Sequence, residues 1–174
     1  MLRAFLAALA LGVASPVTVS AELLLRSVAW QLPSPPGARP RGFRAIERWI
    51  QPSSAKLRST PRVVVTVVNR GPSAAEGTVL RYAIAARMAR AGDTGVEGVW
   101  AVPFYLNERR VARVGANQVK EIPLNDLVLD VFLKKSFRAG YWPDALKIQV
   151  MVEPRAGESL EQRILEATLP VVAK

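Results

Sequence analysis

Runs in which every second residue is apolar divide most of this chain into short predicted β-strands. The clearest run is 62–69, where valines fall on both faces of the strand, so both faces are expected to be covered. Asn69, Gly71 and Pro72 then end the strand, because the first two tolerate positive φ and proline cannot donate to a strand ladder. Further strands are expected at 22–32, at 78–89, at 96–106, at 111–114 running on into 119–123, at 127–133, at 145–153 and at 164–172. Seven or eight short strands predict an all-β chain folded as an antiparallel immunoglobulin-like β-sandwich.

Two of these predicted strands depend on how the alternation is interpreted. Residues 78–89 contain several alanines that also suit a helix, although a strand is favoured. Within 96–106, the residues expected to face the core are Trp100, Val102, Phe104 and Leu106. Residues 107–110 are predicted to form a hairpin tip, and residues 134–144 a loop.

Residues 33–61 interrupt the strand pattern and are predicted to be an insertion. The segment opens with several prolines and then places Phe43, Ile46, Trp49 and Ile50 at spacings of three, four and seven. This spacing predicts one short amphipathic helix over 41–51, with arginines on its other side.

The first 21 residues are typical of a bacterial export signal. Arg3 gives a basic start, residues 4–14 are apolar, and residues 19–21 form a small-residue cleavage site. The apolar run is too short to span a bilayer as a helix, so a cleaved signal is favoured over a permanent anchor. We therefore expect cleavage after Ala21, a single domain over residues 22–174, and a periplasmic or secreted protein.

Composition removes several classes of chemistry. The chain has no cysteine and no histidine, which excludes disulfides, thiol nucleophiles and the usual zinc sites. Lys and Arg number 24 against 14 Asp and Glu, a formal net charge of +10 that becomes +9 without the signal. For an exported protein this charge favours an acidic protein, anionic lipid or acidic polysaccharide over nucleic acid. We expect no cofactor.

Four short motifs follow one another along the chain. They are an acidic residue and an apolar strand at 22–25, a V-x-V-x-V-x-N-x-G pattern at 63–71, the hairpin-like sequence YLNE at 105–108, and VEP at 152–154. In this order they resemble the CARDB family, the cell-adhesion-related immunoglobulin-like domains of bacteria. The Asn-Asn pair that usually precedes the family's last strand is absent near Arg163, and the insertion is an addition to the pattern. The resemblance implies a binding or spacer module without catalytic residues.

The remaining candidates for catalysis or metal binding are weak. Asp93-Thr94-Gly95 is the triplet of aspartic proteases, but it occurs once and follows a glycine. Lys134-Lys135-Ser136 contains a serine beside lysines, yet adjacent lysines favour a solvated loop. Asp126 and Asp130 would lie roughly 13 Å apart on a strand, too far for an acid–base pair. Glu97 and Asp93 are too few carboxylates for calcium. An enzyme is therefore the least favoured class of function.

The basic insertion is the most plausible functional site. Its apolar residues stand beside arginines, and the candidate interaction residues are Arg41, Phe43, Arg44, Arg48, Trp49 and Ile50. We predict a non-catalytic interaction module whose partner is another envelope protein. The alternative is a polyanion or membrane-surface binder that uses Arg39, Arg41, Arg44, Arg48, Arg58 and Arg62. The same apolar stripe is also consistent with a structural cap on the sandwich, and residues 137–142 form a second candidate patch.

Overall fold

The structure is a computed structural model that describes residues 21–173, apart from 38, 40, 41, 52–58, 94, 95, 126 and 154–159. Its elements are β1 (Leu23–Pro33), β2 (Phe43–Ala45), β3 (Trp49–Gln51), β4 (Arg62–Asn69), β5 (Val79–Arg90), β6 (Val99–Trp100), β7 (Tyr105–Arg110), β8 (Val119–Leu124), α1 (Leu129–Arg138), β9 (Tyr141–Val152), the 3-10 turn η1 (Leu160–Arg163) and β10 (Ile164–Ala173).

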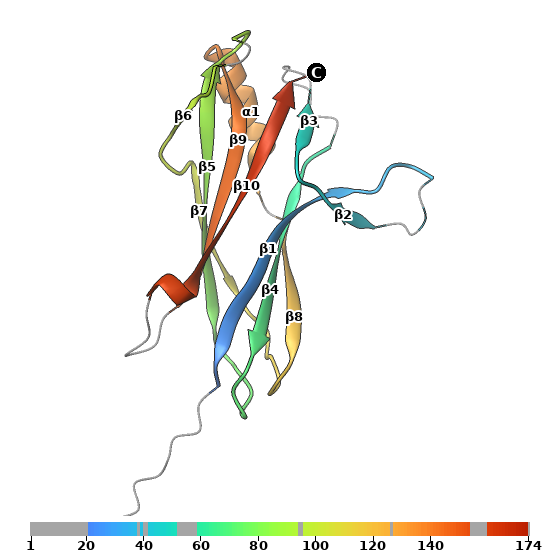
Figure 1. Cartoon of the computed structure of the whole chain (residues 1–174), viewed down its shortest axis with the longest axis vertical. Coiled ribbons are helices and arrows are strands. Elements are labelled where there is room, and N and C mark those ends of the chain that lie inside the picture. The colour runs from blue at the N-terminus through green and yellow to red at the C-terminus, as the bar shows by residue number, and fades with distance from the viewer. Residues whose placement is uncertain are drawn as a thin grey trace, which may run out of the picture.

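The strands form two sheets that pack face to face (Figure 1). The smaller sheet has the order β2-β1-β4-β8, and the larger has the order β3-β10-β9-β5-β6, with β7 also paired to β5. Among the described strands every pairing is antiparallel except that of β3 with β10. The predicted immunoglobulin-like β-sandwich is therefore confirmed. It has more strands than predicted because the insertion contributes β2 and β3 and the segment 96–106 divides between β6 and β7.

The two sheets enclose one apolar core. In β4, Val63, Val65 and Val67 are fully buried and point toward the opposite sheet. In β9, the alternating residues Ile148 and Val150 are also fully buried, as the sequence pattern predicts. Each such side chain contributes about 1.5–3 kcal/mol when removed from water, so the central strands β4, β5 and β9 supply most of the stability.

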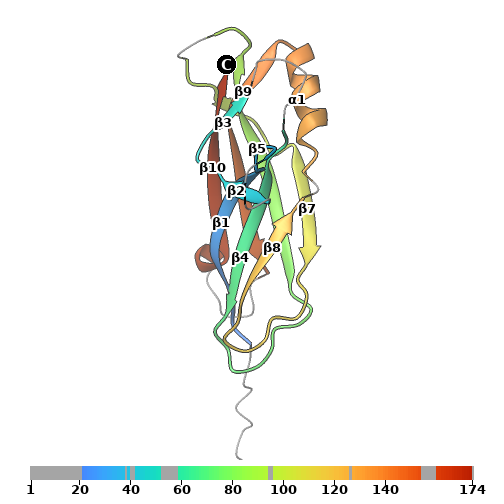
Figure 2. The same cartoon turned by 90° about the vertical axis from the view of Figure 1, so that its right-hand side faces the viewer.

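The chain contains one short α-helix, α1, but it lies where the sequence predicts a strand and a loop. Leu129, Leu133 and Ser136 are its buried residues, which is the i, i+4, i+7 spacing of one helical face. Phe132 stacks on Phe104, with the ring centroids 3.6 Å apart. Figure 2 shows α1 at the end of the sandwich where the chain then enters β9. The helix therefore covers one end of the core.

The amphipathic helix predicted over 41–51 is absent from the described part of the insertion. Residues 43–45 and 49–51 are strands instead. The first three pair with β1, and the second three pair with β10. Backbone pairing with these two strand edges replaces the hydrogen bonds that a helix would have made within itself.

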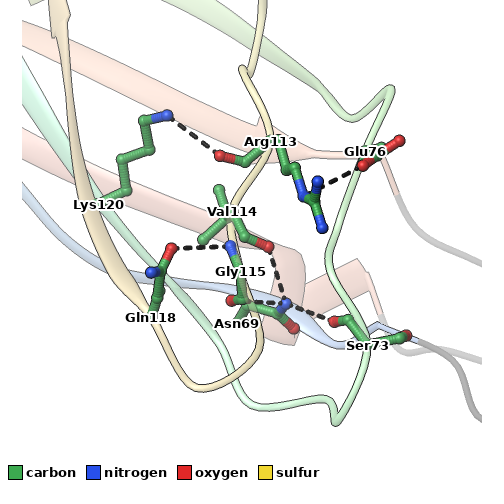
Figure 3. A network of polar contacts seen from close by, with 8 residues as sticks. All are labelled: Asn69, Ser73, Glu76, Arg113, Val114, Gly115, Gln118 and Lys120. Carbon is green, nitrogen blue, oxygen red and sulfur yellow. Dashed lines mark hydrogen bonds and ion pairs between the residues drawn. The ribbon is translucent and has the colours of Figure 1, made fainter.

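Asn69, at the end of β4, joins three segments of backbone at one end of the sandwich (Figure 3). Its side chain is fully buried, and its Nδ2 donates to the carbonyl oxygens of Ser73, Val114 and Gly115 at 2.8–3.1 Å. Its Oδ1 accepts from the backbone N–H of Glu22 at 3.1 Å and of Gly71 at 3.0 Å. The asparagine of the V-x-V-x-V-x-N-x-G motif therefore holds the start of β1 against two loops.

Candidate functional site

The insertion bridges the two sheets along the side of the sandwich formed by β1 and β10. β2 extends the smaller sheet, because residues 43–45 pair with residues 31–33 of β1. β3 extends the larger sheet, because residues 49–51 run parallel to residues 171–173 of β10. Between the two strands, the Ile46 N–H donates to the Trp30 carbonyl at 2.9 Å. Phe43, Arg44, Trp49 and Ile50 therefore lie on these two strands, and Arg48 immediately precedes β3.

The structure separates the apolar residues that the sequence placed on one helical stripe. Trp49 is 0% exposed and belongs to the core, so it is not available to a partner. Ile46 is half-buried against the core. Phe43 is 44% exposed, and Ile50 is 53% exposed. In β3 the side chains alternate, with Trp49 in the core and Ile50 exposed, whereas all three residues of β2 are exposed.

A cavity of about 940 Å³ opens beside these strands. We call it the insertion cavity. Its described lining residues are Leu32, Pro35, Pro36, Arg44, Ala45, Ile46, Glu47, Arg48, Ile50 and Ser59. Of the predicted interaction residues it brings together Arg44, Arg48 and Ile50. Arg41 lies outside the described residues.

The arginines of the insertion have different surroundings. Arg62 donates from Nε and Nη2 to Oε1 of Gln31, at 3.1 and 2.9 Å, and its guanidinium lies 3.4 Å from the ring centroid of Phe43. This contact fixes both side chains on the surface of the smaller sheet. Arg44 and Arg48 are exposed and make no ion pair within the described part of the chain. Arg58 lies outside the described residues. The cationic surface at the insertion cavity therefore centres on Arg44 and Arg48.

The residues considered as candidates for catalysis make structural contacts instead. Ser136 donates its hydroxyl to the Phe132 carbonyl within α1, and Lys134 pairs with Asp130 one helical turn earlier at 3.7 Å. Glu97 forms an ion pair with Arg87. Among the described residues no three His, Cys, Asp or Glu side chains are grouped so as to hold a metal ion. Asp126 and the Thr94-Gly95 part of the protease-like triplet lie outside the described residues.

Residues 137–142, the second candidate patch, turn partly inward. Trp142 is buried, and the ring of Phe137 meets it edge-on at a centroid distance of 6.1 Å. Tyr141 is 47% exposed. Trp142 therefore belongs to the core, whereas Phe137 and Tyr141 remain exposed at the surface near α1.

Residues 96–106 do not face the core in the way that the sequence pattern predicts. Trp100, Val102 and Leu106, which were expected to face the core, are 40%, 83% and 74% exposed. The regular alternation breaks between β6 and β7, and a shift of one residue moves a strand's whole apolar set to the other face. Five apolar residues between 96 and 106 are exposed in this way: Val96, Val99, Trp100, Val102 and Leu106. An apolar segment that the fold does not bury is a second candidate for contact with a ligand.

Comparisons with known proteins give matches only at the level of structure. No family description and no curated protein matches the sequence. The crystal structure of the CARDB domain of the PF1109 protein from Pyrococcus furiosus, in complex with di-metal ions, aligns with 88% of this chain and 96% of its own at 11% identity and a TM-score of 0.42. The solution structure of that domain aligns at 12% identity and a TM-score of 0.41, over 88% of this chain and 97% of its own.

A β-glucosidase from Erythrobacter marinus also aligns with 87% of this chain, but with 16% of its own length, at 13% identity and a TM-score of 0.37. Both of the Pyrococcus furiosus structures are of a CARDB domain, the family that the sequence motifs resemble. The assignment of the fold rests on the strand pairing described above. No helix in the described residues is long and apolar enough to cross a membrane.

Proposed function

We propose that this chain is an exported, non-catalytic interaction module of the bacterial cell envelope that binds a protein partner at the insertion cavity. The observation that supports this most directly is the way the insertion is held. Its two short strands extend different sheets, so Ile50 and Arg44 are exposed on fixed backbone. Binding residues on rigid elements lose little conformational freedom when a partner docks, and so they favour binding.

The chemistry of the insertion cavity fits an apolar segment that carries acidic side chains. Leu32, Ile46 and Ile50 form apolar walls, and Pro35 adds a surface with no backbone donor. Arginine at such a surface recognises carboxylates through paired hydrogen bonds, which Arg48 can supply at the rim. Arginine is one of the residues enriched at protein-binding surfaces.

Export is supported by residues 1–21, which have the basic start, the apolar run and the small-residue cleavage site of an export signal. The backbone N–H of Glu22 donates to the Asn69 side chain, and the Glu22 carbonyl accepts from the Arg70 N–H at 2.8 Å. Cleavage after Ala21 would leave both contacts in place, because the new terminal amine remains a donor at the same acceptor.

The test uses purified residues 22–174 immobilised and exposed to an envelope extract of the source bacterium. Ile50→Asp places a charge in the insertion cavity, and Val119→Asp is the matched control, because Val119 is a strand residue on β8 that is 50% exposed. We expect wild type and Val119→Asp to retain the same partner and Ile50→Asp to lose it. Equal retention by all three proteins would contradict the proposal.

The alternative function is binding of an anionic polymer or lipid surface through Arg44 and Arg48. The exposure of these two side chains favours it, whereas the missing helix removes the membrane-binding amphipathic face that the sequence predicted. Salt separates the two functions. Binding through arginines to a polyanion weakens steeply between about 0.05 and about 0.5 M NaCl, while an apolar protein interface changes little. A double variant in which glutamine replaces both Arg44 and Arg48 while Ile50 is kept is the second experiment that separates the two functions.

A further inference from the structure

The outer face of the larger sheet carries a trough that runs along β5. Two cavities of about 510 Å³ and about 160 Å³ lie over this face, and Ala83 and Gln149 line both of them. The floor is low because β5 presents alanine at two successive outward positions, Ala83 and Ala85, whereas its inward residues Tyr82 and Ile84 fill the core. We call this feature the β5 trough. It follows directly from the sequence of β5, and it lies on a different sheet face from the insertion cavity.

An exposed tryptophan stands at one end of the β5 trough. Trp100 lies opposite Arg87 in the β5–β6 pair and is 40% exposed, whereas Trp30, Trp49 and Trp142 are buried. The Lys147 ammonium lies 4.9 Å from its ring centroid, and the Arg87 guanidinium lies 5.8 Å away. These cations hold the ring in one orientation over the sheet. Trp100 is therefore a fixed aromatic platform that the core does not use.

The polar lining of the β5 trough is electrically balanced. Its charged side chains among the described residues are two cations, Arg81 and Lys147, and two carboxylates, Glu108 and Glu166. Lys147 lies 3.8 Å from Glu166, and Gln149 donates to Glu166 at 2.7 Å. The lining therefore carries no net charge, although the whole chain has a formal net charge of +10. It favours an uncharged ligand, since neither sign of charge is attracted more than the other.

The position of the trough on a sheet face decides between two kinds of uncharged chain. β5 is paired on both sides, with β9 and with β7 or β6, so its backbone groups are already used in the ladders. A peptide lying here would leave most of its own N–H and C=O groups without backbone partners. A sugar chain has no such backbone groups. Its C–H faces can stack on an aromatic ring while its hydroxyls exchange hydrogen bonds with amide, carboxylate and ammonium groups.

We propose that the β5 trough binds a neutral linear oligosaccharide. Trp100 stacks on one sugar ring, Lys147 donates to hydroxyls, Glu166 accepts from them, and Gln149 does both. Ala83 and Ala85 leave the depth that the chain occupies, over a distance of roughly 13 Å between residues 81 and 85. The larger cavity falls within the usual size range of ligand sites.

The experiment titrates purified residues 22–174 with linear hexasaccharides of α-1,4-glucose, β-1,4-glucose and β-1,4-N-acetylglucosamine, and follows tryptophan fluorescence and calorimetry. A neutral hexapeptide of valine and serine is titrated in parallel. Because the other three tryptophans are buried, a change in fluorescence reports on Trp100. We expect at least one hexasaccharide to bind at concentrations below about 10 mM, with an affinity unchanged by about 0.5 M NaCl.

Two variants and a control locate the site. Ala83→Leu fills the trough from its floor without entering the core and is expected to abolish binding. Trp100→Ala is expected to weaken it about tenfold. Ala45→Leu, at an exposed strand residue of the insertion cavity, should bind as wild type does. The proposal is overturned if no hexasaccharide binds, if the peptide binds instead, or if Ala83→Leu retains full affinity. None of these outcomes affects the protein partner proposed for the insertion cavity.

Discussion

Replacing Asn69 by alanine should cost about 4 kcal/mol of folding free energy, a large part of the roughly 5–15 kcal/mol available to a domain of this kind. The side chain makes five hydrogen bonds to backbone groups. Those to the Val114 carbonyl and the Gly71 N–H are buried, but the Val114 carbonyl still accepts from the Ala75 N–H at 2.9 Å, so the group left stranded is the Gly71 N–H, at about 1–3 kcal/mol. The other four contacts are lost at about 0.5 kcal/mol each, because their backbone groups keep another partner or are partly exposed to water.

Asn69→Asp tests the physical reason for this loss. The aspartate has almost the same shape and keeps an acceptor for Glu22 and Gly71, but it can no longer donate to the three carbonyl oxygens. It also directs a buried negative charge at those oxygens, which is unfavourable in a low dielectric. We therefore expect Asn69→Asp at neutral pH to be at least as unstable as Asn69→Ala.

Urea unfolding followed by circular dichroism measures both variants. With a slope of about 2 kcal/mol per molar urea, the midpoint should fall by about 2 M while the slope stays constant. Gln118→Ala is the graded control, because this exposed side chain makes a single hydrogen bond to the Gly115 N–H in the same network. It should cost less than about 1 kcal/mol. A stability of Asn69→Asp close to that of wild type would show that shape, and not donation, explains the asparagine.

Three further predictions concern the insertion, the helix α1 and the N-terminal signal. Trp49→Ala should lower the free energy of unfolding in urea by about 3–5 kcal/mol, whereas Ile50→Ala should change it by less than about 1 kcal/mol. Equal losses of stability would mean that both side chains face the core. Leu133→Ala should cost about 2–5 kcal/mol of folding free energy, because Leu133 lies on the buried face of α1, whereas Val131→Ala should cost less than about 1 kcal/mol, because Val131 is exposed. In a strand the two side chains would share one face, so equal losses would contradict the helix. Intact-mass analysis of the protein isolated from its native compartment should give a chain that begins at Glu22, and a mass that includes the first residues would contradict cleavage of the signal.

The strands that the sequence predicted well are those in which neighbouring residues carry enough information. β4 is a nearly unbroken run of apolar β-branched residues, and residues 145–152 of β9 are buried in near-alternation, so local pattern and tertiary environment agree. α1 was missed because Leu129 and Leu133 are four residues apart, a spacing common to a strand face and to a helix face. Burial of Ser136 three residues later completes a helical face, but a serine gives no hydrophobic signal from which this could be predicted.

The insertion shows a different limit of local reasoning. The spacing of Phe43, Ile46 and Trp49 fits a helix, yet the edges of β1 and β10 offer unpaired backbone groups to the same residues. Those edges come from residues about 12 and about 120 positions away, so no window of sequence contains them. The candidate arginines were identified from charge alone, and charge does not show which arginine finds a contact within the protein. Arg44 and Arg48 are exposed at the cavity, whereas Arg62 is held on Phe43.

Both candidate binding surfaces arise where the chain departs from regular antiparallel pairing. The insertion adds short strands at the β1 and β10 edges. The two-residue strand β6 pairs with β5 and places Trp100 over the outer face of β5, before the chain leaves regular pairing ahead of β7. A side chain in the centre of a sandwich is selected for packing and cannot change without a cost in stability. A side chain on an added edge strand or an interrupted strand lies outside that constraint and is free to serve binding. Because the two surfaces share no lining residue, loss of one by mutation should leave the other intact.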